Sequence, residues 1–104
     1  MTLVKAAKLS DIPPGGRAIV LVGETRVILF NAAGKLYAVE DVCSHDEGSL
    51  DNGPLEDFEV ECPRHGARFD IRTGEATRMP AIAPIRTFPV KVEGDDVLIE
   101  TSHD

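Results

Sequence analysis

The chain has 104 residues and a formal net charge of −7, which fits one small domain with a modest core. Its hydrophobic content of 42 % excludes a disordered tail, and the acidic balance disfavours nucleic acid as a partner. The longest apolar runs, residues 18–22 and 27–30, are too short to cross a bilayer. The N-terminus lacks the pattern of a signal peptide, so we expect a cytoplasmic protein with no membrane partner.

Short β-strands separated by frequent turns are predicted along most of the chain. Prolines and glycines at 13–16, and glycines at 23, 34, 74 and 94, separate runs rich in β-branched residues. No stretch shows an apolar stripe with a period of 3.6 residues. The expected strands are residues 3–8, 17–22, 26–31, 35–40, 69–71, 85–93 and 97–101. This pattern predicts an all-β fold, a small antiparallel β-sandwich or barrel.

Cysteines and histidines gather in two short clusters. The chain has two cysteines and three histidines. Cys43 and His45 form one cluster, and Cys62 and His65 form the other. Two thiolates and two imidazoles suit a tetrahedral zinc ion, or a [2Fe–2S] cluster in which two histidines replace two cysteines on one iron.

The spacing favours the iron–sulfur cluster. Zinc modules usually place like ligands together in each half of the motif, whereas here each half is mixed. Two similar loops would then each give one ligand to each iron, with Cys43 and Cys62 on one iron and His45 and His65 on the other. A mixed zinc site stays open, and so does a disulfide between the cysteines, although a disulfide leaves the histidines unexplained.

The pattern Cys-x-His followed by Cys-x-x-His, with Gly66 after the last ligand, resembles the Rieske iron–sulfur family. The resemblance covers nearly the whole chain. It implies one [2Fe–2S] cluster per chain, bound by Cys43, His45, Cys62 and His65.

The resemblance also implies how the single domain is divided. A scaffold of about residues 1–41 and 69–104 would carry an inserted cluster-binding subdomain of about residues 42–68. The loop at about residues 78–84, which contains Pro80, would cover the cluster and exclude water from it.

Two departures from high-potential members of the family predict a low reduction potential. Those members carry an extra cysteine in each ligand loop, and this chain has none. They also place serine and tyrosine hydroxyls near the sulfurs, where this chain has Ala67 and Phe69. Because hydrogen bonds to sulfur stabilise the reduced state, we expect a value near the low end of roughly −150 to +300 mV.

The resemblance implies a one-electron carrier rather than an enzyme. Oxygenases of the family hold a further iron with two histidines and a carboxylate, and only His103 is left over here. The chain is similar to the ferredoxin components of bacterial multicomponent aromatic-ring dioxygenase systems, in the catabolism of aromatic hydrocarbons. We expect it to take electrons from a flavin-containing reductase and pass them, through His45 and His65, to a terminal non-haem iron oxygenase. Alternatives are the small subunit of a nitrite reductase and a non-redox zinc-binding interaction module.

Charge and size suggest how the partners meet. Nine of the eighteen acidic residues lie between Glu40 and Glu61, and no Lys or Arg lies between Lys35 and Arg64. An acidic surface there would steer the chain onto basic patches of transient partners, although it could also serve solubility alone. We expect a monomer, because a carrier must dissociate quickly.

Overall fold

The computed structural model of the chain describes residues 2–43 and 48–101. Within them the chain forms β-strands and one short 3₁₀ helix, η1 (Leu9–Asp11). None of their helices is both long and apolar enough to cross a membrane. The strands are β1 (Thr2–Lys8), β2 (Arg17–Val22), β3 (Thr25–Ala32), β4 (Lys35–Glu40), β5 (Leu55–Glu56), β6 (Glu59–Glu61), β7 (Arg68–Asp70), β8 (Ala76–Arg78), β9 (Thr87–Phe88), β10 (Val90–Glu93) and β11 (Asp96–Thr101).

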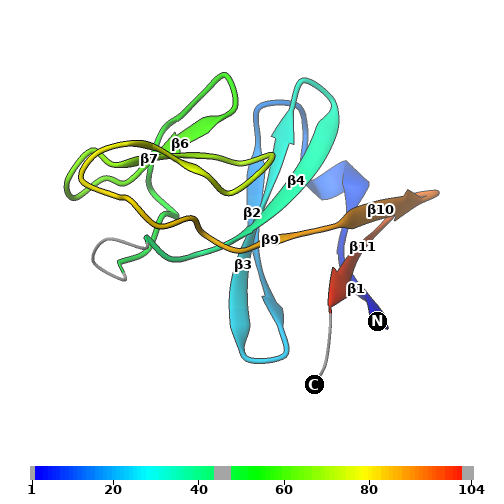
Figure 1. Cartoon of the computed structure of the whole chain (residues 1–104). Coiled ribbons are helices and arrows are strands. Elements are labelled where there is room, and N and C mark those ends of the chain that lie inside the picture. The colour runs from blue at the N-terminus through cyan, green and yellow to red at the C-terminus, as the bar shows by residue number, and fades with distance from the viewer. Residues whose placement is uncertain (1, 44–47, 102–104) are drawn as a thin grey trace.

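The strands form three antiparallel sheets (Figure 1). The first sheet has the order β1-β11-β10, the second β2-β3-β4-β9, and the third β5-β6-β7-β8. Figure 1 shows the second sheet between the other two, with β6 and β7 on one side and β1, β10 and β11 on the other. The predicted all-β antiparallel fold is confirmed.

Strand β3 is buried on both faces, which explains its unbroken apolar sequence. Side chains alternate across a strand, so Ile28 and Phe30 face one core while Val27 and Leu29 face the other. The core on the Ile28 side also contains both cysteines. The core on the Val27 side is closed by the first sheet. The central sheet therefore separates a purely structural core from the one that holds the candidate site.

The strand predicted at residues 85–93 is wrong as a single element. The structure divides it into β9 and β10 at Pro89. Strand β9 pairs with β4, whereas β10 pairs with β11 in the first sheet. Proline has no N–H to donate to a ladder, so the chain changes sheets there, and the Pro89 carbonyl still accepts a hydrogen bond from the Glu100 N–H at 2.9 Å.

The sequence patterns missed three strands of the third sheet, β5, β6 and β8. Each has only two or three residues, and most of them are charged or small. Runs this short carry no measurable period. Pairing with other segments of the chain defines them: β6 pairs with β7 across the second cysteine loop, β5 pairs with β6, and β8 pairs with β7.

Candidate metal centre

The two cysteines lie in one hydrophobic core although nineteen positions separate them in the sequence. Cys43 follows the end of β4, and Cys62 directly follows β6. Both are fully buried, and they share a cluster with Leu50, Val60 and Ala81. Exclusion of water from thiolate ligands is what an iron–sulfur site requires.

The two cysteine loops are closed in the same way. The Cys43 N–H donates to the Gly48 carbonyl at 2.7 Å, and the Cys62 N–H donates to the Ala67 carbonyl at 2.6 Å. In both loops the acceptor lies five residues after the cysteine. In the second loop Gly66, with φ of 76°, also donates its N–H to the Cys62 carbonyl at 3.0 Å. The same closing hydrogen bond thus follows each cysteine, which is compatible with two similar ligand loops.

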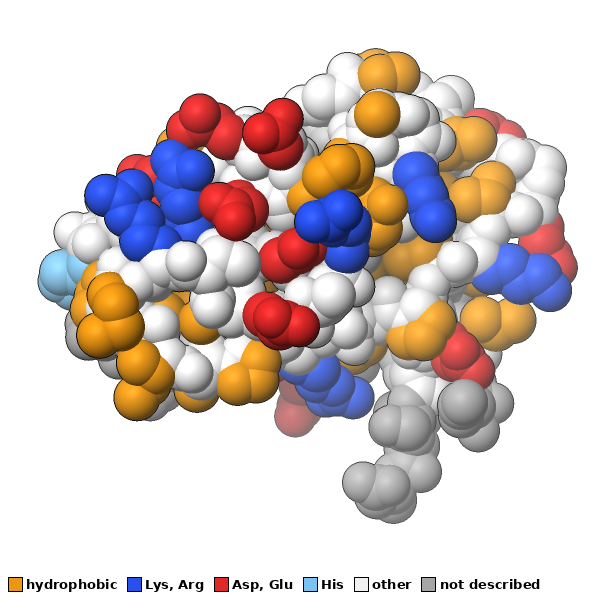
Figure 2. All heavy atoms as spheres, turned by 45° about the horizontal axis from the view of Figure 1, so that its top comes forward, with side chains coloured by type: hydrophobic (Ala, Val, Ile, Leu, Met, Phe, Trp, Pro, Cys, Tyr) orange, Lys and Arg blue, Asp and Glu red, His pale blue; other side chains and the backbone are white. Residues whose placement is uncertain are grey.

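His65 lies at the exposed tip of the second loop, beside the exposed residues Pro63 and Arg64. It is the one histidine in the part of the chain that the structure describes. Figure 2 shows the histidine side chain (pale blue) at one edge of the molecule, next to a group of hydrophobic side chains (orange). His45 and His103 lie outside the described residues. The second loop therefore presents a buried thiol and an exposed imidazole.

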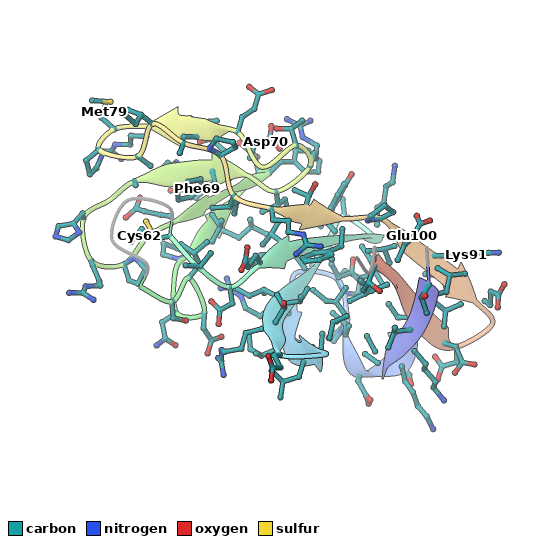
Figure 3. All side chains as sticks on the ribbon, turned by 60° about the horizontal axis from the view of Figure 1, so that its bottom comes forward. Cys62, Phe69, Asp70, Met79, Lys91 and Glu100 are labelled. Carbon is teal, nitrogen blue, oxygen red and sulfur yellow. The ribbon has the colours of Figure 1, made fainter. Side chains whose placement is uncertain are left out.

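The loop between β8 and β9 contributes to both the core and the surface near the cysteines. Ala81 is 4 % exposed and belongs to the same core as Cys43 and Cys62. Met79 and Ile82 are 71 % and 83 % exposed. Figure 3 shows Met79, Cys62 and Phe69 towards one end of the molecule and Lys91 and Glu100 towards the other. The large apolar side chains of Met79 and Ile82 are thus exposed at the end of the molecule where Cys62 lies.

Ala67 and Phe69 provide no hydroxyl to the site. Both are fully buried in the core that contains Cys62. The side chains at these two positions can exclude water, but they cannot donate a hydrogen bond to sulfur.

Arginines neutralise several of the carboxylates between Glu40 and Glu61. Arg68 Nη2 lies 2.8 Å from Glu56 Oε1 and 3.0 Å from Glu61 Oε1, and its Nη1 lies 3.5 Å from Glu59. The hydrogen bond to Glu56, followed by the one to Glu61, raises the pKa of Arg68 above its usual range. The segment between Glu40 and Glu61 therefore presents less net negative charge to an approaching partner than its sequence indicates.

A second ion pair closes the turn after β7. Arg72 Nη2 lies 2.9 Å from Asp70 Oδ2. The hydrogen bond from the Arg72 side chain lowers the pKa of Asp70. Asp70 also accepts the Arg72 N–H at 2.8 Å, so this carboxylate stabilises the turn.

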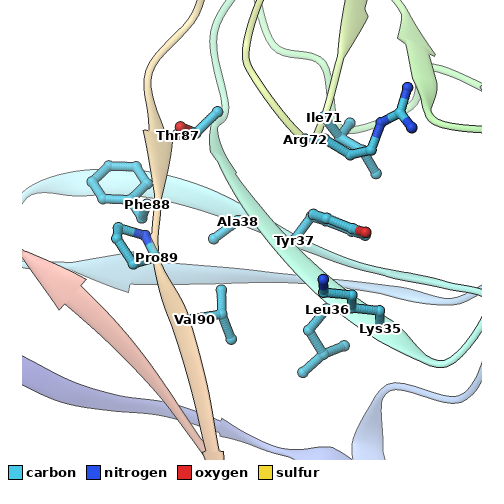
Figure 4. A pocket seen from close by; sticks show the side chains of 10 residues that line it. All are labelled: Lys35, Leu36, Tyr37, Ala38, Ile71, Arg72, Thr87, Phe88, Pro89 and Val90. Carbon is cyan, nitrogen blue, oxygen red and sulfur yellow. The ribbon is translucent and has the colours of Figure 1, made fainter.

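A pocket of about 320 Å³ lies away from the cysteines (Figure 4). Tyr37, Arg72 and Phe88 are among its lining residues. Tyr37 also packs edge-on against Phe58, with ring centroids 6.0 Å apart. None of the residues that line the pocket is a predicted ligand.

Gly53 brings the end of the first loop region against the strand that leads into Cys62. A Cβ at this position would overlap the Glu61 carbonyl oxygen. From the other side, Arg17 Nη1 donates to the carbonyls of Asp51 and Gly53 at 2.8 and 2.7 Å. The turn at Asp51–Gly53 is therefore held between β2 and β6.

Gly53→Ala is expected to destabilise the fold by about 1–3 kcal/mol, because the added methyl must displace backbone. It should also lower the amount of iron bound, since Glu61 directly precedes Cys62. Thermal unfolding and iron content measure the two effects. Gly94→Ala is the control for iron content. Its φ of 63° strains an alanine, so stability should fall there too, but its hairpin lies in the first sheet and the bound iron should stay at the wild-type amount. Full iron content in Gly53→Ala would contradict the prediction.

The residues present fit a [2Fe–2S] cluster. Two buried thiols and an exposed imidazole would supply three of its four donors, and the fourth predicted donor, His45, lies outside the described residues. Among the residues described, no group of three Cys, His, Asp or Glu side chains is placed to hold one metal ion. A cluster with two cysteines on one iron and two histidines on the other needs no such group.

Known proteins resemble this chain over nearly its whole length. The model of the Rieske [2Fe–2S] domain matches residues 2–89. The ferredoxin component of biphenyl 2,3-dioxygenase from Rhodococcus jostii (strain RHA1) is 43 % identical over 100 residues, which cover 96 % of this chain and 94 % of the relative.

Solved structures of ferredoxins resemble this chain as well. The ferredoxin of carbazole 1,9a-dioxygenase from Nocardioides aromaticivorans IC177 has a TM-score of 0.92 and 35 % identity, over 98 % of this chain and 100 % of that one. A ferredoxin solved in complex with the oxygenase of carbazole 1,9a-dioxygenase has a TM-score of 0.86 and 33 % identity, over 93 % of this chain and 91 % of that one. With its two buried cysteines and its fold, the chain therefore belongs to the Rieske [2Fe–2S] family and is a ferredoxin, a carrier of single electrons on one [2Fe–2S] cluster.

Proposed function

We propose that this ferredoxin takes electrons from a flavin-containing reductase and passes them to a terminal non-haem iron oxygenase that acts on aromatic compounds. The observation that carries the proposal is the second loop, which joins a buried cysteine to an exposed histidine three residues later. The names of the relatives, ferredoxin components of dioxygenases, support the class of acceptor.

We further propose the ligand set Cys43, His45, Cys62 and His65. The thiolates would bind the inner iron and the imidazoles the outer one. The cluster-binding subdomain would comprise about residues 42–68, with strands β7 and β8 completing its sheet. The burial of Ala81 among the cysteines supports a covering role for the loop at residues 78–84.

The chain's own residues then have separate tasks. When bound, the cluster supplies reversible one-electron chemistry. Leu50, Ala67 and Phe69 exclude water from the thiolate side, because all three are fully buried. His65 is exposed, so its ring offers the short path along which an electron leaves for a partner. A monomer that dissociates quickly suits this task, and buried reduced thiols suit the cytoplasm.

Met79 and Ile82 are proposed to contact the oxygenase. Ile82→Ala is expected to slow the bimolecular transfer of an electron about fivefold or more, because exposed apolar side chains at the centre of an interface contribute strongly to binding. Leu21→Ala is the matched control, since Leu21 is 67 % exposed on β2. Stopped-flow mixing with the oxygenase component of a biphenyl 2,3-dioxygenase measures the rate. Equal rates for both variants would contradict this docking surface.

The function itself is tested with the same acceptor. The ferredoxin, reduced with dithionite and freed of excess reductant, is expected to reduce the oxygenase and to return to its oxidised visible spectrum. Reconstitution with a flavin-containing ferredoxin reductase and its nicotinamide donor should then support turnover. A reducible cluster that transfers no electron to any aromatic-ring oxygenase would refute the proposed partner and leave the nitrite reductase alternative.

A further inference from the structure

Asp41 is a buried carboxylate that links the two ends of the first cysteine loop. Its side chain is fully buried, and it is the only acidic residue that is buried in the part of the chain that the structure describes. It lies directly after β4 and two residues before Cys43. A buried carboxylate is costly unless its oxygens are paired, so its partners indicate its role.

The two carboxylate oxygens of Asp41 contact different parts of the chain. Oδ1 accepts the Leu50 N–H at 2.8 Å and the Ser49 hydroxyl at 2.9 Å. Oδ2 accepts Arg26 Nε at 3.1 Å and Nη2 at 3.0 Å. The Asp41 N–H also donates to the Arg26 carbonyl at 2.8 Å. Asp41 therefore attaches the far end of the loop to the central sheet.

Two sets of hydrogen bonds, one inside the other, join the two ends of the first cysteine loop. The Cys43 N–H bonds the Gly48 carbonyl, and Asp41 bonds Ser49 and Leu50 outside it. The residues enclosed by both links include the proposed ligand His45. Leu50 is fully buried, so water cannot replace the carboxylate as the acceptor for its N–H.

The second cysteine loop needs no such carboxylate. Strands β6 and β7 pair on either side of it, with Glu61 opposite Arg68. The first loop is entered from β4, but residues 48–50 form no strand, so no ladder joins its two sides. Asp41 supplies through its side chain the link that a β-ladder supplies in the second loop.

We propose that Asp41 is a positioning residue for the cluster, which holds the first ligand loop in the shape that the iron requires, and that Arg26 orients it. The inference rests on the proposed ligand set. In this role Asp41 acts through the loop and does not touch the cluster. Loss of the carboxylate should free the loop and let iron leave, while the sheets persist.

Asp95 provides a matched control. Its carboxylate accepts the Ser10 N–H at 2.9 Å and the Ser10 hydroxyl at 3.0 Å. Asp95→Ala thus removes one negative charge and a pair of hydrogen bonds of the same chemical kind. These bonds lie beside the first sheet, away from the core with the cysteines.

The experiment compares holoprotein of the wild type, Asp41→Ala, Asp41→Asn and Asp95→Ala. Under nitrogen with an iron chelator, Asp41→Ala is expected to lose its visible absorbance about tenfold faster than the wild type, whereas Asp95→Ala keeps the wild-type rate. Asp41→Asn should partly restore retention, because its amide oxygen still accepts from Leu50. The EPR spectrum of reduced Asp41→Ala should also shift or broaden, and amide exchange at Leu50 should rise.

Several outcomes would overturn the proposal. Wild-type cluster loss and an unchanged EPR spectrum in Asp41→Ala would do so, and so would equal acceleration in Asp41→Ala and Asp95→Ala. If Asp41→Ala does not fold, Ser49→Ala removes the hydroxyl's bond to Asp41, together with the bond that it accepts from the Asp51 N–H at 3.1 Å, and leaves the Leu50 bond to Asp41 in place. Wild-type retention of the cluster in that variant would count against the role. A wild type that binds no cluster would instead refute the ligand set.

Discussion

Cys62→Ser is expected to yield a protein without the visible absorbance of an iron–sulfur cluster. The thiol is fully buried in the core shared with Cys43, and a serine hydroxyl is a poor, hard donor to iron that also stays protonated at neutral pH. Because cluster binding contributes to folding free energy, the thermal unfolding temperature should fall as well. Iron and sulfide analysis, visible spectra and thermal unfolding measure these effects. A coloured Cys62→Ser protein with full iron and sulfide would remove Cys62 from the ligand set.

The histidine half of the ligand set is tested by a matched pair. His65→Ala is expected to lose the cluster or the EPR spectrum typical of mixed histidine and cysteine ligation. His103→Ala should behave as the wild type, because the sequence assigns His103 no role. His65 is exposed, so its removal leaves the core intact, and cluster loss would follow from lost ligation. Identical spectra of both variants would contradict the proposed role of His65.

Restoring hydroxyls near the cluster is expected to raise the reduction potential. Ala67→Ser and Phe69→Tyr each place an O–H donor in the fully buried core around Cys62. Reduction adds negative charge to the cluster, and a hydrogen bond to a charged acceptor is worth about 1.5–3 kcal/mol. If about three-quarters of that energy appears on reduction, the reduction potential of each single variant should rise by about 50–100 mV and that of the double variant by about 100–200 mV. Potentiometric titration followed by EPR gives the value.

Phe88→Tyr is the control for added hydroxyl and volume. Phe88 is 7 % exposed and lies in the other core, which contains no cysteine. Its substitution should leave the potential at the wild-type value even if the unfolding temperature falls. An intact cluster with an unchanged or lower potential in Phe69→Tyr would contradict the prediction that the absence of these hydroxyls lowers the potential.

Local sequence determined much of the scaffold and the proposed ligands. The strands β2 and β4 begin and end at the predicted residues. The signals that predicted them, a β-branched apolar run in β2, alternation in β4 and turn residues at their ends, all lie within a few neighbouring residues. The Cys/His pattern likewise predicted the donors, because the chemistry needs those residue types at close spacing. The predicted cysteines lie in one core, and the family assignment agrees with this.

Tertiary structure decided which polar residues support the site. The sequence shows nine acidic residues between Glu40 and Glu61 without distinguishing Asp41 from the others, and only the fold places Asp41 against Arg26 and Leu50. The same is true of Gly53, whose close approach to Glu61 joins segments that no local pattern connects. Such contacts form between residues distant in sequence, so no window of neighbouring residues contains the information that specifies them. Strand periodicity is a local property of the chain. The contacts of Asp41 and Gly53, in contrast, form only when the sheets pack against one another.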